Sequence, residues 1–465
     1  MDYKTRTKIA AILIEDQVPA GDEVIILGLV RSVRRSKEVA FVEVNDGSCM
    51  GNIQGVVSNP DELADFDKLN SGAAVRMKGT LVESQGKGQK YEVAVTVLEV
   101  VGPVDAEYPL QKKRHSFEFL REIAHLRMRT NTFGAVNRIR SKLSYAIHQY
   151  YQERGFYYIH TPIISTSDCE GAGDLFAVTT MDLTSIPIKD GQIDWSSDFF
   201  ATQAFLTVSG QLEAELAATA LGDVYNFGPT FRAENSNTAR HASEFWMIEP
   251  EMAWAELDDN MDLAEDFLKH LFSFSLDKCQ DEMDFFGNWI DKEVRQTLES
   301  VIKAQFERIS YTEAIDVLLK ARHDFEYPVK WGVDLQTEHE RYLTEKAFKK
   351  PVIVYDYPEE IKSFYMRVND DGKTVRGMDV LVPRVGEIIG GSQREERLDI
   401  LEERVKKKGM TNREAYQWYL DIRRWGTMPH SGFGLGFDRL VMYVTGMANI
   451  RDVQPFPRVP RWAKF

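Results

Sequence analysis

Short runs of alternating apolar and polar positions fill the N-terminal part of the chain. An alternation of period two predicts strands that bury one face, and the turn Asn45-Asp46-Gly47 favours a hairpin. Five such strands within about 80 residues predict a small closed barrel, of which the oligonucleotide-binding (OB) fold is one form. The expected strands are residues 24–27, 39–44, 53–57, 74–82 and 91–100.

The pattern changes after Gly102, where prolines and the basic run Lys112-Lys113-Arg114 interrupt it. Residues 134–154 then carry apolar side chains at helical spacing, which predicts a long helix. Beyond them, helical and strand patterns alternate without a regular βαβ rhythm, as is typical of an antiparallel sheet surrounded by helices. The expected strands in this part are residues 223–231, 244–254, 352–355, 363–368 and 377–392.

These patterns divide the chain into an N-terminal barrel and a larger mixed domain. We expect an α+β protein with an OB-fold domain over residues 1–102, a hinge over 103–120 and a second domain over 121–465. The chain has 465 residues, of which 43% are hydrophobic, and this length suits about two or three domains. Residues 182–200 and 256–350 carry no motif that indicates a function.

Composition narrows the class of protein. The three cysteines, Cys49, Cys169 and Cys279, are far apart and show no CxxC spacing, which argues against a disulfide framework or a structural zinc site. The N-terminus lacks the apolar segment of a signal peptide, and no apolar run reaches the roughly 18 residues that span a membrane. We therefore expect a soluble, cytoplasmic protein without a membrane partner.

The formal net charge of −15 argues against a generic nucleic-acid binder, whose surface would be basic overall. The negative net charge does not exclude a local basic face. Lysines and arginines gather between Arg31 and Lys37, and again between Lys112 and Arg114. Either cluster alone is also typical of a solvated loop, so charge does not decide between the two interpretations.

Three later segments carry groups that bind phosphate. The chain has neither a Walker loop nor a GxGxxG between a strand and a helix, so arginine would have to bind the phosphates of a nucleotide. One segment holds Arg232, Glu234 and Arg240, a second runs over residues 386–394, and a third is the glycine-rich run 432–440. Each segment alone is weak evidence for a nucleotide-binding site. The evidence becomes strong because all three occur together in this order.

In this order the segments resemble the signature motifs of class II aminoacyl-tRNA synthetases. Residues 155–162 resemble motif 1, the dimer-interface helix and strand that end in proline. Residues 223–254 resemble motif 2, two antiparallel strands and their loop, and residues 432–446 resemble motif 3, a strand that leads into a helix. The barrel, with Phe41 and residues 53–56, resembles the anticodon-binding domain of subclass IIb. The resemblance covers nearly the whole chain.

This resemblance implies an enzyme that uses ATP to activate an amino acid and then transfers it to the 3′ end of a tRNA. It assigns Arg232 to the ATP α-phosphate and the amino-acid carboxylate, and Arg439 to the γ-phosphate and one adenine face. It implies Mg²⁺ held by Asp379 and Glu387, whose spacing differs from the family pattern by one residue. The other ATP contacts that it implies are Glu234 at the adenine amino edge, Phe245 on the second adenine face, and Arg240 and His241 at the outer phosphates.

The amino-acid substrate is predicted from the pocket residues that the resemblance implies. Gln211 corresponds to the family glutamine near the α-ammonium group, and Glu170 to the mobile-loop acid that closes over it. Aspartyl enzymes of the family carry a lysine three residues after this glutamine, where this chain has Ala214. With that lysine absent, Arg394 as a donor and Glu249 as an acceptor suit a neutral amide. We therefore expect asparagine, ligated to tRNA(Asn) through an asparaginyl-adenylate with release of AMP and pyrophosphate.

Three alternatives remain open. An aspartyl-tRNA synthetase, including one that charges both tRNAs, is the nearest, and Ala214 argues against it. A non-catalytic RNA-binding or regulatory relative need not keep Arg232, Glu387 and Arg439. An asparagine synthetase built on the same catalytic fold does not need an anticodon-binding barrel.

The barrel is expected to bind the tRNA anticodon, because unstacked bases are recognised by stacking and by hydrogen bonds to their edges. We expect Phe41 to stack on the central base, and Arg31 and Gln54 to contact base edges. A buried role for Phe41 within its alternating strand is the competing interpretation. The resemblance to motif 1 further implies a two-fold homodimer with Pro162 near the interface.

Overall fold

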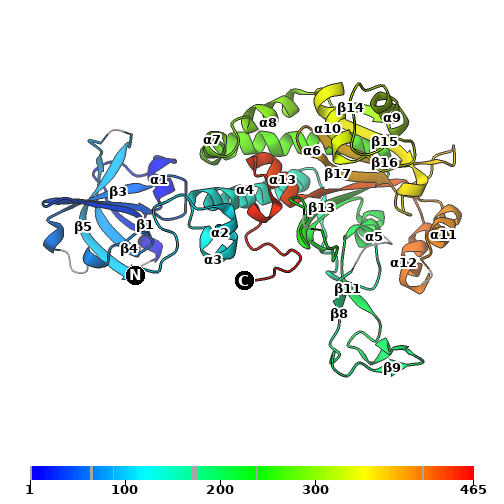
Figure 1. Ribbon diagram of the computed structural model, residues 1–465, viewed down its shortest axis with the longest axis horizontal. Helices are drawn as coiled ribbons and strands as arrows, with labels where there is room; N and C mark the ends of the chain where they lie inside the picture. Colours follow the sequence, from blue (N-terminus) through cyan, green and yellow to red (C-terminus); the bar gives the residue numbers. More distant parts are fainter. Residues whose placement is uncertain (1–2, 63–65, 87, 170–174, 237, 411–412) are drawn as a thin grey trace. The chain divides into compact units, whose positions relative to one another are not determined.

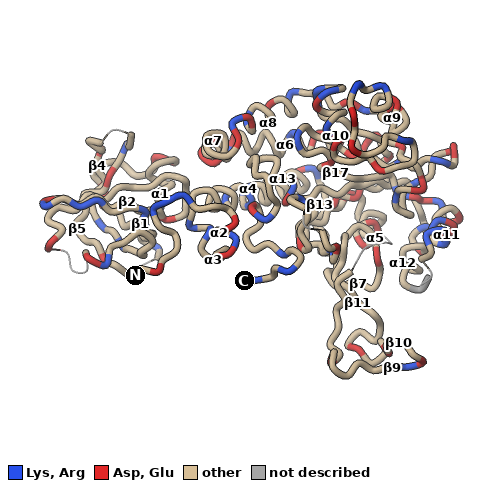
Figure 2. Tube along the Cα trace, viewed as in Figure 1, with Lys and Arg blue, Asp and Glu red and all other residues tan. Residues whose placement is uncertain are grey.

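The chain forms two compact units, Met1–Ala135 and Val136–Phe465 (Figure 1). Besides the barrel, the first unit includes two short helices, α2 (Phe117–Glu122) and α3 (Ala124–Arg127). Acidic and basic residues are interspersed along both units (Figure 2). The computed structural model describes residues 3–62, 66–86, 88–169, 175–236, 238–410 and 413–465.

The first unit is built on a closed barrel with the strand order β1-β2-β3-β5-β4, which confirms the predicted five-stranded barrel. The long β1 pairs with β2 along one part and with β4 along another, and so closes the barrel. The predicted hairpin is formed by β2 and β3, which are antiparallel. The strands are β1 (Glu23–Arg35), β2 (Val39–Asn45), β3 (Ile53–Ser58), β4 (Ala74–Glu83) and β5 (Tyr91–Gly102).

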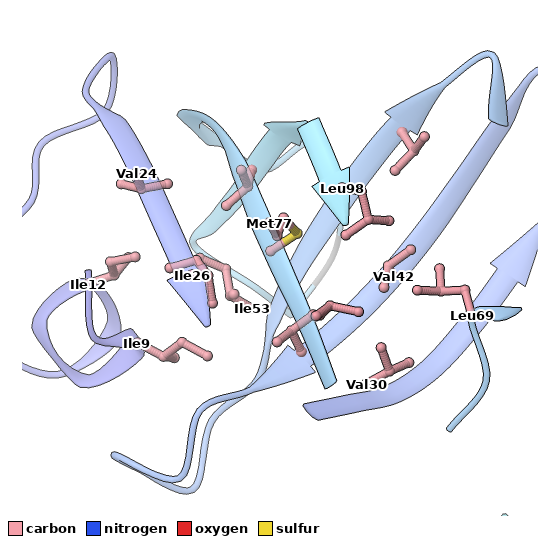
Figure 3. Close-up of a cluster of buried hydrophobic side chains, with 14 of the residues drawn as sticks. Ile9, Ile12, Val24, Ile26, Val30, Val42, Ile53, Leu69, Met77 and Leu98 are labelled. Carbon is pink, nitrogen blue, oxygen red and sulfur yellow. The ribbon is translucent and has the colours of Figure 1, made fainter. Parts of the chain in front are cut away.

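The barrel core combines alternate side chains of the strands with the helix α1 (Ile9–Leu13). Ile9 and Ile12 of this helix are buried among apolar side chains from the strands (Figure 3). In β2 the buried positions alternate with Phe41 and Glu43, which are only partly buried. Phe41 therefore does not belong to the core, and its ring is available on the outer side of the barrel.

An eight-stranded sheet forms the centre of the second unit, in the order β14-β15-β16-β17-β18-β13-β12-β6. The strands from β15 to β12 are antiparallel, as predicted, whereas β14 and β6 join the two edges in parallel. Both edge strands connect to their neighbours through long segments with helices, as a parallel pair requires. The strands are β6 (Tyr157–Tyr158), β12 (Asp223–Phe231), β13 (Glu244–Ala253), β14 (Glu307–Ser310), β15 (Val352–Pro358), β16 (Thr374–Val382), β17 (Gly386–Gln393) and β18 (His430–Gly436).

Two predicted strands differ from expectation. Residues 363–368 form no strand and make only isolated bridges. The buried guanidinium of Arg404 uses their backbone instead, since it donates to the carbonyls of Ser363 and Met366 at 2.9 Å each. Residues 377–392 fall into two strands, β16 and β17, because the chain reverses within this segment and pairs with itself.

Helices cover the central sheet and confirm the predicted α+β class. Helix α6 packs across it, and Asn260 of this helix donates to the Gly432 carbonyl of β18 at 2.9 Å. No helix in the described ranges has the length and apolar character needed to cross a membrane. The remaining helices are α4 (Asn131–Glu153), α5 (Gln211–Leu221), α6 (Leu257–Lys278), α7 (Gln280–Trp289), α8 (Val294–Lys303), α9 (Tyr311–Leu319), α10 (Thr337–Tyr342), α11 (Leu398–Lys407), α12 (Arg413–Arg424) and α13 (Phe437–Thr445).

The segment 182–200, which carries no motif, lies in an arm that extends away from the sheet (Figure 1). A three-stranded sheet forms its base, and a two-stranded hairpin lies near its tip. Leu183 and Phe199 are exposed on this arm. Its strands are β7 (Ile164–Ser165), β8 (Ala177–Val178), β9 (Ile188–Lys189), β10 (Gln192–Ile193) and β11 (Ala204–Leu206).

Candidate active site

Alternate residues of β13 place the site on one face of the central sheet. Phe245, Met247, Glu249 and Glu251 point to the same side, because successive side chains of a strand alternate between its faces. Two adjoining cavities lie over this face, the first beside Phe245 and the second beside Glu249 and Glu251, and Met247 borders both.

The first cavity brings together every residue predicted to bind ATP. They come from the β12–β13 loop, from β13, from β17 and from the start of α13. The lining includes Arg232, Glu234, Arg240, His241, Phe245, Glu387 and Arg439.

The second cavity holds the described residues that were predicted to bind the amino acid and the metal ion. They come from α5, β13, β16 and β17, and Arg394 directly follows β17. The lining includes Gln211, Glu249, Asp379, Glu387 and Arg394, together with Arg232. Glu170 lies outside the described residues.

Arg232 lies where the two cavities meet and lines both of them. It directly follows β12, and its backbone N–H donates to the Ser243 carbonyl at 3.0 Å, which closes the loop between the strands. Its guanidinium carbon lies 5.4 Å from the centre of the Phe245 ring. A guanidinium at this junction can contact an anion in either cavity.

Helix α13 holds Arg439 against the first cavity. The preceding residue, Asp438, is buried and accepts hydrogen bonds from the Trp246 N–H at 3.1 Å and from Arg140 at 2.5 Å. These contacts fix the start of the helix to β13 and α4. Arg439 then lies with a guanidinium nitrogen 3.7 Å from a carboxylate oxygen of Glu387. This is the strand-to-helix junction predicted for residues 432–446.

The first cavity favours a polyanion. Burial lowers the pKa of Arg240 and of His241, and the nearby Arg439 lowers both further. Arg240 remains a charged donor and bonds to the Val385 carbonyl at 2.8 Å, whereas His241 is held in its neutral form near pH 7. Three arginines in one cavity, with a neutral imidazole beside them, suit the phosphates of a nucleotide.

Asp379 and Glu387 converge at the second cavity from neighbouring strands. A bulge between Val380 and Leu381 shifts the pairing of β16 and β17 by one residue. Gly390 leaves room for both carboxylates, because a Cβ there would lie 3.1 Å from an oxygen of Glu387 and 3.5 Å from one of Asp379. Two converging carboxylates fit the share of Mg²⁺ coordination that a protein usually supplies.

Two further groups at this position have no counterpart among the predicted residues. The ammonium of Lys362 lies 2.8 Å from Asp379 Oδ2 and balances its charge. Glu340 accepts the Glu387 N–H at 3.1 Å, and burial, reinforced by Glu387, raises its pKa to about 8. Glu340 is therefore mostly neutral at pH 7. Within the described ranges no three His, Cys, Asp or Glu side chains are arranged to hold a metal ion.

Glu249 is buried in the second cavity and bound by neutral donors. Its carboxylate accepts hydrogen bonds from the Ser209 hydroxyl, from the Gly210 N–H at 3.1 Å and from the Asn226 amide at 3.0 Å. None of these donors carries a charge, and none of the ion pairs between described residues involves Glu249. A carboxylate has about four acceptor positions, so one remains for a ligand.

Arg394 has a partner that sequence reasoning missed. Its guanidinium donates to both carboxylate oxygens of Glu251, through Nε at 3.1 Å and through Nη2, and to the Ser392 hydroxyl at 2.8 Å. Gly432 makes room for this pair, because a Cβ there would lie 2.4 Å from the carboxyl carbon of Glu251. Ala214, where aspartyl enzymes of the family carry lysine, is fully buried in an apolar cluster.

The outer face of the barrel gathers two of the three predicted anticodon-binding residues. Arg34 of β1 pairs with Phe41 of β2, with its guanidinium carbon 5.6 Å from the ring centre, and donates to the side-chain carbonyl oxygen of Gln54 at 2.9 Å. Arg31 is engaged elsewhere, since it donates to the Arg129 carbonyl and the Asn131 side chain. The structure therefore adds Arg34 to this face and does not bring Arg31 to it.

Comparison with known proteins finds the same two domains and the same family over nearly the whole chain. Residues 116–460 match the tRNA synthetases class II (D, K and N) family, and residues 24–101 match the OB-fold nucleic acid binding domain family. The asparagine–tRNA ligase of Nostoc sp. is 60% identical over 98% of this chain and 99% of its own length. That of Geotalea uraniireducens is 58% identical, with 99% of both chains covered. The crystal structure of asparaginyl-tRNA synthetase from Pyrococcus horikoshii complexed with asparaginyl-adenylate is similar with a TM-score of 0.85 and 33% identity, and 98% of each chain is covered.

Proposed function

Because this chain belongs to the class II tRNA synthetases, and among them to the asparagine–tRNA ligases, we propose that it activates asparagine with ATP at the two cavities and transfers it to tRNA(Asn). The position of Arg232 at the junction of the two cavities is the main support for assigning this function to particular residues. One guanidinium can there bind an ATP phosphate and an amino-acid carboxylate at the same time.

Arg232 aligns the two substrates for in-line attack. An oxygen of the asparagine carboxylate attacks the α-phosphorus, the bond to the bridging oxygen breaks, and pyrophosphate leaves with the electron pair. The carboxylate is already ionised, so the step needs no general base, and positioning and charge neutralisation lower the barrier. In the second step a ribose hydroxyl at the tRNA 3′ end attacks the carbonyl carbon of the adenylate, and AMP leaves.

The first cavity holds ATP between Phe245 and Arg439, which stack on the two adenine faces. Glu234 accepts from the adenine amino group, and Arg240 and His241 contact the outer phosphates. Mg²⁺, when bound, neutralises charge on the phosphates. Asp379 and Glu387 are the residues that would hold it.

The second cavity selects a neutral amide. Gln211 binds near the α-ammonium group, and Glu170 belongs to the loop proposed to close over it. Arg394 donates to the side-chain oxygen of asparagine, and the remaining acceptor position of Glu249 takes its NH₂ group. Aspartate would place a second carboxylate beside Glu249, which has only neutral donors around it. Ligation of aspartate is therefore not favoured.

The assay that tests this function is ATP–pyrophosphate exchange with each of the twenty amino acids. We expect exchange with asparagine to exceed that with aspartate by several orders of magnitude, because a site built for one polar group rejects an analogue that cannot pair with it by about 10⁴–10⁵. Equal exchange with the two amino acids would restore the aspartyl alternative. Absence of exchange with all twenty would contradict the proposed activity.

The barrel supports a second test, which concerns tRNA. We propose that the outer face with Arg34, Phe41 and Gln54 binds the anticodon, with Phe41 as the stacking surface. Phe41→Ala should weaken tRNA charging by about 1–3 kcal/mol, the usual contribution of one stacked base, and leave tRNA-independent pyrophosphate exchange unchanged. Val97→Ala, which shortens an exposed apolar side chain on the same barrel, is the control. Equal losses in both assays would mean that Phe41 supports the fold and not recognition.

The edge of the sheet at β6 supports a homodimer. Tyr157 is 58% exposed, and Ile163 and Ile164, which follow the exposed Pro162, are 45% and 42% exposed. Large apolar side chains that cluster at a sheet edge mark an interaction surface. We expect sedimentation at micromolar concentration to give the mass of two chains, and Ile163→Asp combined with Ile164→Asp to shift it to one. A wild-type protein that sediments as one chain would contradict this assembly.

A further inference from the structure

A buried carboxylate that the reaction does not use lies behind the second cavity. Glu215 is on α5 and is fully buried. Its carboxylate accepts hydrogen bonds from Arg423 at 2.6 Å, from His430 at 2.9 Å, from the Tyr419 hydroxyl at 2.8 Å and from the Gln211 amide at 3.0 Å. One carboxylate thus ties together α5, α12 and β18, and it holds the side chain of Gln211.

The same carboxylate lies beside Arg394. Glu215 Oε1 is 3.9 Å from Arg394 Nε, and Arg394 also makes its two contacts with Glu251. A guanidinium carries five N–H donors, and the contacts with Glu251 and Ser392 use three of them. Two donors remain for a ligand in the second cavity, although two carboxylates already surround the positive charge.

Glu215 is the carboxylate of this cluster that stays ionised. Burial on its own raises the pKa of Glu215, but Arg423, His430 and Arg394 outweigh it, so the pKa lies well below its usual range and Glu215 is ionised. Burial also raises the pKa of Glu251, and the carboxylates of Glu215 and Glu249 add to this shift, while Arg394 opposes it. Glu215 therefore supplies a full negative charge beside Arg394, whereas the raised pKa of Glu251 reduces the charge of that carboxylate.

We propose that Glu215 is a positioning residue that sets the choice between asparagine and aspartate. Its negative charge offsets the charge of Arg394, so that Arg394 donates hydrogen bonds to an amide oxygen but offers little net positive charge to a carboxylate. This inference rests on the proposed function of the second cavity. It differs from the role of Glu249, because Glu215 acts through Arg394 and Gln211 and does not line the cavity.

Glu215→Gln tests the proposal, since it keeps the shape of the side chain and removes its charge. The ratio of kcat/KM for asparagine to that for aspartate in pyrophosphate exchange should fall at least about tenfold, because one unit charge at about 4 Å is removed from a buried guanidinium. The KM for aspartate should fall, whereas loss of fold alone would lower activity with both amino acids equally. Equal losses would overturn the proposal.

A matched control is Glu282→Gln, which removes a buried carboxylate that pairs with Arg138 at 2.9 Å and lines neither cavity. It should leave the ratio unchanged, and an equal shift in this variant would also overturn the proposal. If Glu215→Gln does not fold, the double variant Glu215→Gln/Arg423→Gln removes one charge of each sign from the buried cluster, which limits the loss of stability. The ratio is expected to shift in the same direction by a smaller factor, because Glu215 lies 3.9 Å from Arg394, whereas Arg423 contacts Glu215. An unchanged ratio in the folded double variant counts against the proposal.

The proposed function and the role of Glu215 can be contradicted by different results. A wild-type protein without asparagine-dependent exchange would contradict the proposed function. A wild-type protein that prefers asparagine, with Glu215 variants that keep the wild-type ratio, would contradict only the role of Glu215.

Discussion

Arg232→Ala should reduce asparagine-dependent pyrophosphate exchange by roughly a hundredfold or more, on the scale of losing one preorganised donor that stabilises developing charge. Arg232 lines both cavities, so the variant loses a guanidinium placed to contact both substrates. The measurement is kcat/KM for exchange at saturating ATP, with thermal unfolding recorded in parallel. Unfolding should change little, because the side chain is partly exposed in a polar cleft.

The control for this prediction is Arg308→Ala, an arginine that forms surface ion pairs with Asp262 and Glu265 and borders neither cavity. Its exchange activity should match that of the wild type. Near-normal exchange in a folded Arg232→Ala protein would show that Arg232 does not take part in the reaction. It would also contradict the assignment of the two cavities to ATP and the amino acid.

Glu249→Gln is expected to lower asparagine activation by about a hundredfold or more and to narrow the preference over aspartate. The substitution removes both the acceptor for the asparagine NH₂ group and the charge that repels an aspartate carboxylate. Exchange should be measured with both amino acids on the same preparation, with Glu282→Gln as the control. A preference for asparagine that survives Glu249→Gln unchanged would leave the family assignment in place and show that another residue discriminates.

Ala214→Lys, which imitates the aspartyl enzymes, is a weaker test of the same pocket. If the new lysine can reach the substrate, it should move the preference of Glu249→Gln further toward aspartate. Ala214 is fully buried in the apolar cluster with Ala218 and Val224. A lysine there must displace these neighbours or bury its charge, and either cost lowers stability. The double variant is therefore informative only when its unfolding temperature stays near that of the wild type.

The fold could be predicted where local pattern decides the structure. Strand β12 has the predicted bounds, because residues 223–231 lie between clear breaks and pair with the predicted partner strand. Residues 363–368 have the same apolar character, yet form no strand, and Arg404 of α11 binds the carbonyls of Ser363 and Met366. A sequence pattern shows that a segment can be a strand, but not which partner its backbone finds.

The residues of the site could likewise be predicted where a local sequence motif contains them, and could not where the partners come from distant segments. Arg232, Phe245 and Arg439 stand in contiguous motifs, and all line the first cavity. The cluster around Glu215 draws its members from segments far apart in the chain, among them Arg394 and Tyr419. No single stretch of sequence signals such a cluster, since each member alone has the character of a surface ion pair or a core aromatic.

A guanidinium shared by two cavities also links the affinities of their ligands. If asparagine in the second cavity changes the affinity of the first cavity for ATP by some factor, ATP must change the affinity for asparagine by the same factor, because the binding cycle closes. The guanidinium of Arg232 is a charged group through which such a coupling free energy can act directly, because it lines both cavities. Titration of either substrate in the presence and absence of the other measures that free energy, and its loss in Arg232→Ala would assign the coupling to this one side chain.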